Sequence, residues 1–372
     1  MNVPQISPAS STFLNGMRAF SAQIVLVGHA LAIFSLAPEL GEPNSPYMQE
    51  IGVVAFFVLS GFVITHTTRL KMKSPAVQYH FATFLRDRFS RIYSVYFPAL
   101  FVVLGLTMLY NTLKGVDLFL SVGPDQFLGN LFMLQSHPFF RAGIFSQVIG
   151  DPFVHVTSLG LGRPFWSIAV EWWLYIAFGA IYFAVIQWRK STLLKRLAMA
   201  GFIAVTLVVP AHQSLGQHRA LILAWGLGAA TSFVLSTFEG LAKRFAAVFW
   251  ICGIALTFAA PLYLYVTHAG AYSMLFTVGL GAGVLFLLAA LQNLGSSRFS
   301  VVASGWADFS YSLYALHYPI VVLMALAPID GWLKFLITLA LCNVFAYFFA
   351  QIFEKNHYRV RRFLDTLFSR TR

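Results

Sequence analysis

Apolar stretches of about twenty residues recur along the whole chain, and they limit its possible folds more than any other feature. A helix needs about that length to cross roughly 30 Å of hydrocarbon. Only 10% of the residues are charged and 58% are hydrophobic, whereas about a quarter are charged in a soluble protein. The sequence therefore predicts an all-α, polytopic membrane protein with about ten transmembrane helices. The expected spans are 18–37, 51–68, 92–110, 166–187, 197–211, 219–236, 245–266, 271–291, 309–328 and 332–353.

The basic residues are distributed unevenly between the two sides that these spans define. If the connections alternate, twenty of the 25 lysines and arginines fall on the side of the N-terminus. Positive charge gathers in cytoplasmic loops, so both termini are expected in the cytoplasm. The net charge of +12 is then explained by topology and by anionic partners at one membrane face, and no nucleic acid is expected.

We expect one domain with two tails. Residues 1–17 are interpreted as a cytoplasmic N-terminal tail, 18–353 as the transmembrane domain, and 354–372 as a basic cytoplasmic tail on anionic lipid. The two cysteines lie in apolar runs and no metal-ligand spacing occurs, so we expect no disulfide framework, no metal site and no permanently bound cofactor.

The first span carries two ionisable residues on one face. His29 follows Arg18 by eleven residues, which at about 100° per residue puts both on nearly the same face, roughly 16 Å apart along the axis. Arg18 would lie near one membrane surface and His29 near mid-depth, where burying a charge costs a few kcal/mol. A catalytic or transport role is one interpretation. The other is a neutral histidine bonded to a neighbouring helix, with Arg18 as an interfacial anchor.

Three arginines precede the span at 92–110. Arg86, Arg88 and Arg91 lie at the end of the most basic connection, and the last two are three residues apart, so they share a helix face. Guanidinium groups bind phosphate oxygens in bidentate fashion. The arginines are therefore candidates for a phosphorylated ligand entering from the cytoplasm, and binding of anionic lipid is the alternative.

Further candidate residues lie in three other spans. Glu171 is the only acidic residue inside a predicted span, so we expect it to have a partner on another helix. The alternative is a carboxylate near the membrane interface that is shielded by neighbouring tryptophans. The Ser60-Gly61 pair lets a ligand or another helix backbone approach closely. We expect the substrate pocket to comprise Ser60, Gly61, Trp166, Ser167, Tyr311, Tyr314 and His317. The long outer loop at 110–165 is where we expect contacts to an external acceptor.

Five segments together resemble a known family. RAFSAQIVLVGHA, GVVAFFVLSGFVIT, RDRFSRIY, FWSIAVEWWLYI and SYSLYALHYP occur in this order and resemble acyltransferase family 3, a family of multi-pass membrane enzymes. The resemblance implies transfer of acetyl or other short acyl groups from a cytoplasmic donor, usually acetyl-CoA, to hydroxyls of surface polysaccharides, lipid-linked sugars or similar acceptors. It also implies a bacterial cytoplasmic (inner) membrane location and leaves polysaccharide-assembly proteins open as partners.

The same resemblance implies roles for individual residues. The family's essential histidine falls on His29, its preceding arginine on Arg18, its RxxR pair on Arg88 and Arg91, and the glutamate of its W-S-x-x-x-E pattern on Glu171. Some members of the family carry an additional extracytoplasmic esterase-like domain, and we expect none in this sequence after its last span. Whether a separate protein completes the transfer is left open.

We therefore expect acyl-CoA to dock with its phosphates on Arg86, Arg88 and Arg91, and His29 to act as general base on the acceptor hydroxyl. Glu171 would orient the imidazole or stabilise its transient charge, and Arg18 would hold the pantetheine end or the phosphates. Transfer through an acyl-imidazole is a variant. The alternative function is a proton-coupled transporter that uses His29 and Glu171 as a proton relay, and a scaffold for glycan assembly is a third.

Overall fold

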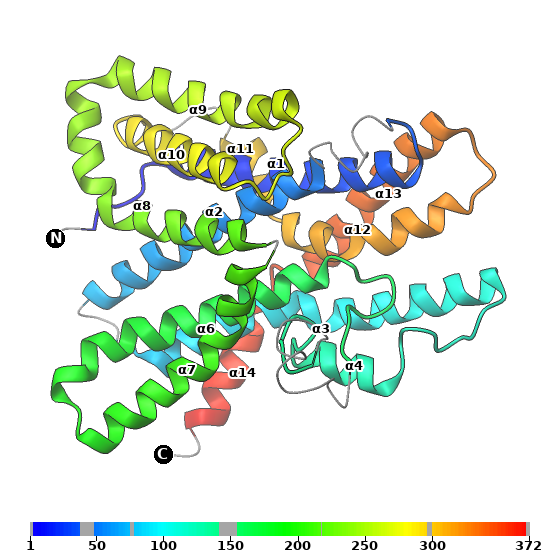
Figure 1. Ribbon diagram of the computed structural model, residues 1–372, viewed down its shortest axis with the longest axis horizontal. Coiled ribbons are helices and arrows are strands. Elements are labelled where there is room, and N and C mark those ends of the chain that lie inside the picture. The colour runs from blue at the N-terminus through cyan, green and yellow to red at the C-terminus, as the bar shows by residue number, and fades with distance from the viewer. Residues whose placement is uncertain are drawn as a thin grey trace. The chain divides into compact units, whose positions relative to one another are not determined.

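The structure, a computed structural model, describes residues 3–37, 48–74, 78–140, 155–216, 218–295 and 300–369 (Figure 1). Within these ranges the regular secondary structure is entirely helical, and nine helices are long and apolar enough to cross a membrane. A further apolar helix, Ser310–Ala325, has 16 residues. The predicted all-α, multi-pass membrane protein is confirmed. Arg141, Arg298, Arg370 and Arg372, which entered the charge distribution, lie outside the described residues.

The chain divides into two compact units, each described by itself. The first comprises 1–77, 216–311 and 329–339. Its helices are α1 (Pro8–Ile33), α2 (Met48–Lys73), α8 (Arg219–Arg244), α9 (Ala246–Thr267), α10 (Met274–Leu291) and α11 (Ser300–Ala307). In this unit α2 packs along α8 and α9 along α10 (Figure 1).

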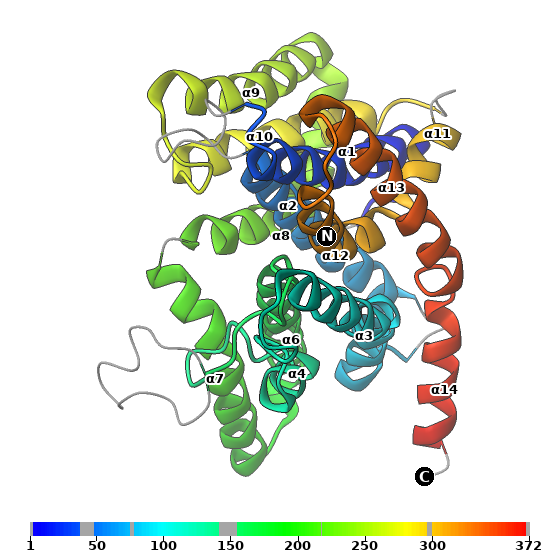
Figure 2. The ribbon, with the colours of Figure 1, turned by 90° about the vertical axis from the view of Figure 1, so that its right-hand side faces the viewer.

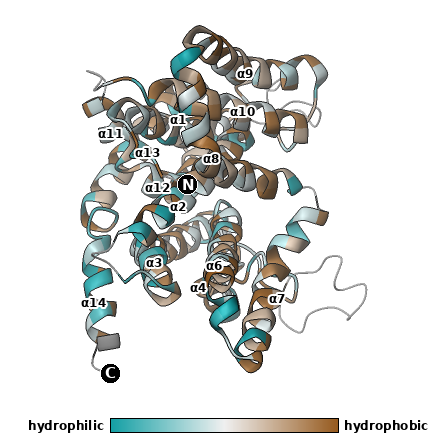
Figure 3. Ribbon diagram, turned by 90° about the vertical axis from the view of Figure 1, so that its left-hand side faces the viewer, coloured by the Kyte–Doolittle hydropathy of each residue, from teal (hydrophilic) through white to brown (hydrophobic). Residues whose placement is uncertain are grey.

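The second unit comprises 78–215, 312–328 and 340–372. Its helices are α3 (Phe81–Lys114), α4 (Pro124–Leu131), α6 (Phe165–Gln187), the 3-10 turn η2 (Trp188–Lys190), α7 (Leu193–Leu215) and α14 (His357–Ser369), with most of α12 (Ser310–Ala325) and α13 (Gly331–Ile352). Helices α6 and α7 lie side by side, and α14 packs on α3 (Figure 2). The ribbon of α14 is mostly hydrophilic in colour (Figure 3).

Helix α1 begins at Pro8 and not at residue 18, as the hydropathy had suggested. The Ser7 side chain accepts a hydrogen bond from the backbone N–H of Ser10 at 3.1 Å, and Pro8 occupies the first helical position. Both are typical of a helix start. Arg18 therefore lies within the helix, and His29 lies near its C-terminal end. The helix boundaries therefore no longer support the expectation that Arg18 lies near one membrane surface and His29 near mid-depth.

Two glycines let α2 and α8 touch through their backbones. A Cβ added at Gly61 would lie 1.9 Å from the carbonyl oxygen of Trp225, and one at Gly228 would lie 1.9 Å from that of Val58. Real Cβ atoms do not come so close to a carbonyl oxygen, so each position requires glycine. The space beside Gly61, a predicted pocket residue, is thus occupied by helix α8, and close helix packing accounts for this glycine.

A basic side chain reinforces the same helix pair. Arg69 on α2, one of the twenty basic residues predicted on the side of the N-terminus, is buried. Its Nη1 donates to the hydroxyl of Ser232 at 3.1 Å and also to the Ser232 carbonyl, and its guanidinium lies 4.3 Å from the ring centroid of Phe233. Groups of α8 therefore stabilise the buried Arg69 guanidinium.

Candidate active site

The predicted site residues fall in both units, and Arg18 belongs to the first. From α1, the Arg18 Nη2 donates to the Ala307 carbonyl at 2.6 Å and its Nε donates to the Ser310 hydroxyl at 3.2 Å. Ala307 is the last residue of α11, and the C-terminal end of a helix favours a cation. The guanidinium is thus held by protein groups where α12 begins, beside Tyr311, which is half-buried.

His29 is half-buried on α1, eleven residues after Arg18, or about 16 Å along the helix axis. A Cβ added at the neighbouring Gly28 would lie 2.7 Å from the backbone nitrogen of Gln49 and from its Oε1, so α1 passes close to the start of α2 here. Ser60 is half-buried on α2. The assignment of His29 as catalytic stays a prediction.

The three arginines lie on the first turns of α3 and not in the connection before it, because α3 already begins at Phe81. Arg86 forms an ion pair with Asp365 of α14 at 2.8 Å, and Arg91 pairs with Glu354 at 3.7 Å. Arg88 is half-buried with its guanidinium 5.8 Å from the ring centroid of Phe84. Each arginine thus has a different protein neighbour. That all three bind the phosphates of one ligand stays a prediction.

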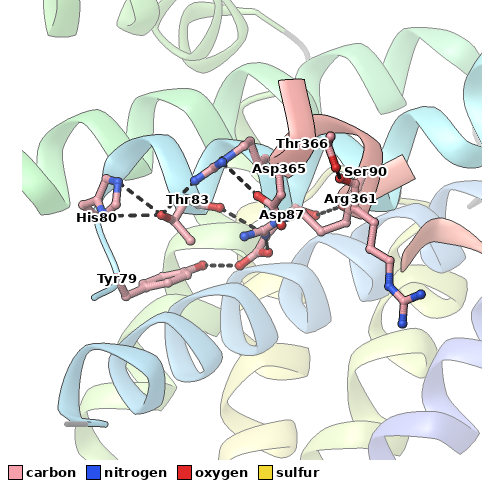
Figure 4. Close-up of polar contacts among 10 residues, drawn as sticks. Tyr79, His80, Thr83, Asp87, Ser90, Arg361, Asp365 and Thr366 are labelled. Atoms are coloured by element: carbon pink, nitrogen blue, oxygen red, sulfur yellow. Dashed lines mark hydrogen bonds and ion pairs between the residues drawn. The ribbon is translucent and has the colours of Figure 1, made fainter. Parts of the chain in front are cut away.

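An acidic residue within the arginine segment ties α3 to α14. Asp87 forms an ion pair with Arg361 and accepts a hydrogen bond from the Tyr79 hydroxyl at 2.9 Å (Figure 4). Arg361 also pairs with Asp365 at 2.9 Å. Burial raises the pKa of Tyr79 above its ordinary value of 10.0, although Arg88 and Arg361 oppose the shift. The phenol therefore stays protonated at neutral pH and can donate to Asp87.

A second polar group forms between α6 and α12. Glu171 accepts a hydrogen bond from the Tyr175 hydroxyl at 2.5 Å. Ser167 and Tyr314 share a hydrogen bond of 2.5 Å, and Ser167 also donates to the Pro164 carbonyl at 2.9 Å. Because Ser167 has one proton and uses it on a carbonyl, Tyr314 is the donor in the pair. The structure thus brings three predicted residues, from the W-S-x-x-x-E and SYSLYALHYP segments, into one unit.

His317 lies on α12 and is fully buried. Its Nδ1 is 3.0 Å from the Leu313 carbonyl and 2.9 Å from the Tyr314 carbonyl. Carbonyl oxygens only accept, so Nδ1 carries the proton and Nε2 holds the lone pair. His317 is thus a second buried imidazole, and it is an alternative to His29 as the candidate base.

The start of α6 is fixed by the segment that follows α4. The Trp166 carbonyl accepts from Ser136 at 2.9 Å, and the Phe165 carbonyl accepts from Gln135 at 2.9 Å. The neighbouring His137 is buried. Burial lowers its pKa below 6.5, and His212 adds to the shift, so the imidazole is neutral at pH 7. This part of the predicted outer loop is packed into the unit.

Sequence reasoning missed Glu354, a buried acid just beyond the last span, and Asp87, the acid between two arginines. It also passed over His66, a buried histidine within α2 whose Nδ1 is 3.5 Å from the Ser232 hydroxyl. A signal existed in each case, because an ionisable residue in or next to an apolar run needs a partner.

Comparison with known proteins identifies the family. The acyltransferase domain of the Acyl_transf_3 family matches residues 11–353. The peptidoglycan O-acetyltransferase OatA of Listeria monocytogenes is 25% identical over 297 residues, which are 73% of this chain and 45% of the relative. The O-acetyltransferase OatA of Staphylococcus aureus is 22% identical over 348 residues, which are 87% of this chain and 53% of the relative.

The chain spans about half the length of these curated relatives. No solved structure matches it. The family match, in contrast, extends from α1 to the end of α13. The chain therefore belongs to acyltransferase family 3.

Proposed function

We propose that the chain is a bacterial cytoplasmic-membrane O-acyltransferase that moves an acetyl or other short acyl group from acyl-CoA to a hydroxyl of a glycan. The observation that carries this proposal is the acyltransferase-family match over residues 11–353. The names of the two relatives support acetyl as the transferred group, and one of them names peptidoglycan as the acceptor. The family match favours an enzyme over the proton-coupled transporter.

In this proposal His29 is the general base. Its neutral imidazole accepts the proton of the acceptor hydroxyl as the oxygen attacks the thioester carbon. The carbon–sulfur bond then breaks, the acyl group stays on the glycan oxygen, and the CoA sulfur takes up a proton. A positioned base contributes about 10²–10⁴-fold to such a step. In the variant through an acyl-imidazole, the His29 nitrogen attacks the thioester carbon, the carbon–sulfur bond breaks and CoA leaves as the thiol. The acceptor oxygen then takes the acyl group from the imidazole, and the hydroxyl proton passes to the freed nitrogen.

The donor would bind through the arginines of α3. Arg91 keeps 37% of its side chain exposed while its Nη2 pairs with Glu354, and a guanidinium has five donors, so Arg91 would have donors left for a phosphate. Arg86 and Arg88 lie on the same turns of α3. Among the three, we therefore give Arg91 the main contact with the donor.

Glu171 would act through its negative charge, which the Tyr175 hydroxyl stabilises. The Ser167–Tyr314 pair would supply hydroxyls beside it. Proteins recognise sugar hydroxyls through hydrogen bonds of this kind. A site built for such bonds discriminates against an acceptor that lacks the hydroxyls.

The test uses purified protein in lipid nanodiscs with labelled acetyl-CoA and glycan fragments, and it measures free thiol and acylated glycan. The wild type is expected to release thiol over many turnovers only when the acceptor is present. His29→Ala is expected to lower the rate by about 10²-fold or more, because the base is lost, while the protein keeps its elution profile in detergent. His268→Asn, at an exposed histidine in left-handed backbone conformation, is the control.

Retained transfer in His29→Ala would remove His29 from the mechanism, and loss of activity in His317→Ala alone would assign the base to His317. Substrate uptake driven by a pH gradient without CoA consumption would replace the enzyme with the transporter.

A further inference from the structure

Glu354 is a buried carboxylate that the proposed chemistry does not use. It lies in the turn between α13 and α14, and only 1% of its surface is exposed. Removing a carboxylate from water costs several kcal/mol unless hydrogen bonds and an opposite charge compensate. Its neighbours therefore indicate what holds it there.

One oxygen of Glu354 caps helix α12. The Oε2 accepts from the backbone N–H of Ser312 at 3.0 Å and from the Ser312 hydroxyl at 2.8 Å. Ser312 is the third residue of α12, and the first N–H groups of a helix have no partner within it. The positive end of the helix dipole also favours an anion here. Glu354 thus fixes the first turn of the helix that carries Tyr314 and His317.

The other oxygen of Glu354 faces Arg91, with Oε1 3.7 Å from Nη2. The Glu354 carbonyl is 3.0 Å from Nδ1 of His357, and the Arg91 Nη1 is 3.4 Å from the same nitrogen. Helix α3 therefore meets the end of α13 and the start of α14 at this guanidinium. Glu354 pairs with the Nη2 of Arg91, and 37% of the Arg91 side chain is exposed, so Glu354 can orient Arg91 without occupying all five of its donors.

We propose that Glu354 is a positioning residue for the acyl donor. It orients the Arg91 guanidinium toward the phosphates of acyl-CoA. The inference rests on the proposed function, because it requires acyl-CoA as the donor.

The test compares two donors in the nanodisc assay. Acetyl-CoA carries nucleotide phosphates, whereas S-acetylpantetheine carries none. Glu354→Gln keeps an oxygen that can accept from Ser312 but removes the charge opposite Arg91. We expect its KM for acetyl-CoA to rise about tenfold, with kcat within about twofold of the wild type, because the loss concerns donor binding. With S-acetylpantetheine, Glu354→Gln and the wild type are expected to have the same KM.

Two variants serve as controls. Ser312→Ala removes one donor to Glu354 but leaves the Arg91 pair, so its KM for acetyl-CoA should stay within about twofold of the wild type. Glu239→Gln removes an acid that pairs with Lys243 on the surface of α8 at 2.9 Å, and it should change neither donor's KM.

An unchanged KM for acetyl-CoA in Glu354→Gln, with an active wild type, overturns the inference. An equal loss with both donors also overturns it, because that pattern indicates a general structural role. If Glu354→Gln does not accumulate, Glu354→Asp takes its place. Its shorter side chain should raise the ratio of the two KM values at least about threefold, and an unchanged ratio counts against positioning. A wild type inactive with both donors and every glycan instead refutes the proposed function.

Discussion

The hydroxyl of Tyr175 is a small group with a large expected effect. It donates to Glu171 at 2.5 Å, and the Tyr175 side chain is buried. A hydrogen bond to a charged group contributes about 1.5–3 kcal/mol. The sequence gives the positions of both residues, four apart on one helix, so their contact could have been predicted from helical spacing. In contrast, no spacing within a helix could predict that Glu354 would contact Ser312 and Arg91, which come from two other helices.

Tyr175→Phe tests the contribution of this hydroxyl. We expect kcat to fall about 10- to 100-fold, in line with a lost hydrogen bond to a charged carboxylate, while the ring still fills its site. Steady-state acylation assays measure the change. Tyr263→Phe on α9, whose side chain is half-buried, is the matched control. If Tyr175→Phe keeps the wild-type kcat, the charge of Glu171 does not act in the rate-limiting step.

Hydropathy predicted which segments form helices, but it did not predict where those helices begin and end. The short span expected at 197–211 is α7, Leu193–Leu215, and the span expected at 92–110 is part of α3, Phe81–Lys114. Hydropathy marks the part of a helix that suits hydrocarbon, whereas the helix continues wherever its backbone is satisfied. Polar residues such as Arg86 and Arg91 therefore lay outside the predicted span but inside the observed helix.

The contact between α2 and α8 gives a prediction about stability. Gly61→Ala places a methyl group 1.9 Å from the Trp225 carbonyl oxygen, so the two backbones must separate. We expect a loss of about 1–3 kcal/mol, as for other overpacked sites, seen as a lower thermal unfolding temperature in detergent. Gly226→Ala on α8 is the control, because nothing lies within 4 Å of an added Cβ there. Equal melting temperatures for the two variants would contradict the packing explanation of Gly61.

For the molecule as a whole, the charge distribution predicts an orientation as well as a fold. The predicted spans put twenty of the 25 basic residues on one side, and this distribution favours cytoplasmic termini. The fold class followed from hydropathy because every apolar stretch must be buried in lipid or protein. How side chains from distant helices pair could not be read from hydropathy, because many pairings satisfy the same pattern.

Labelling of single cysteines tests this orientation. In a background with Cys252→Ser and Cys342→Ala, the exposed positions Gln5, Thr366 and Asp125 are each changed to Cys. A membrane-impermeant maleimide should label Asp125→Cys in cells with a permeable outer layer, and the two terminal positions only in inverted vesicles. Labelling of either terminal position from outside would contradict the predicted topology.

The pairing of Arg69 with Ser232 has a consequence for biogenesis. The two residues are 163 positions apart in the chain, and a ribosome adds roughly 5–20 residues per second. The arginine of α2 is therefore synthesised roughly 8–30 s before the serine that receives its hydrogen bonds. During that interval the insertion machinery, water or lipid headgroups must accommodate the cation. The pair of helices α1 and α2 can reach its final structure only after α8 has been synthesised and inserted.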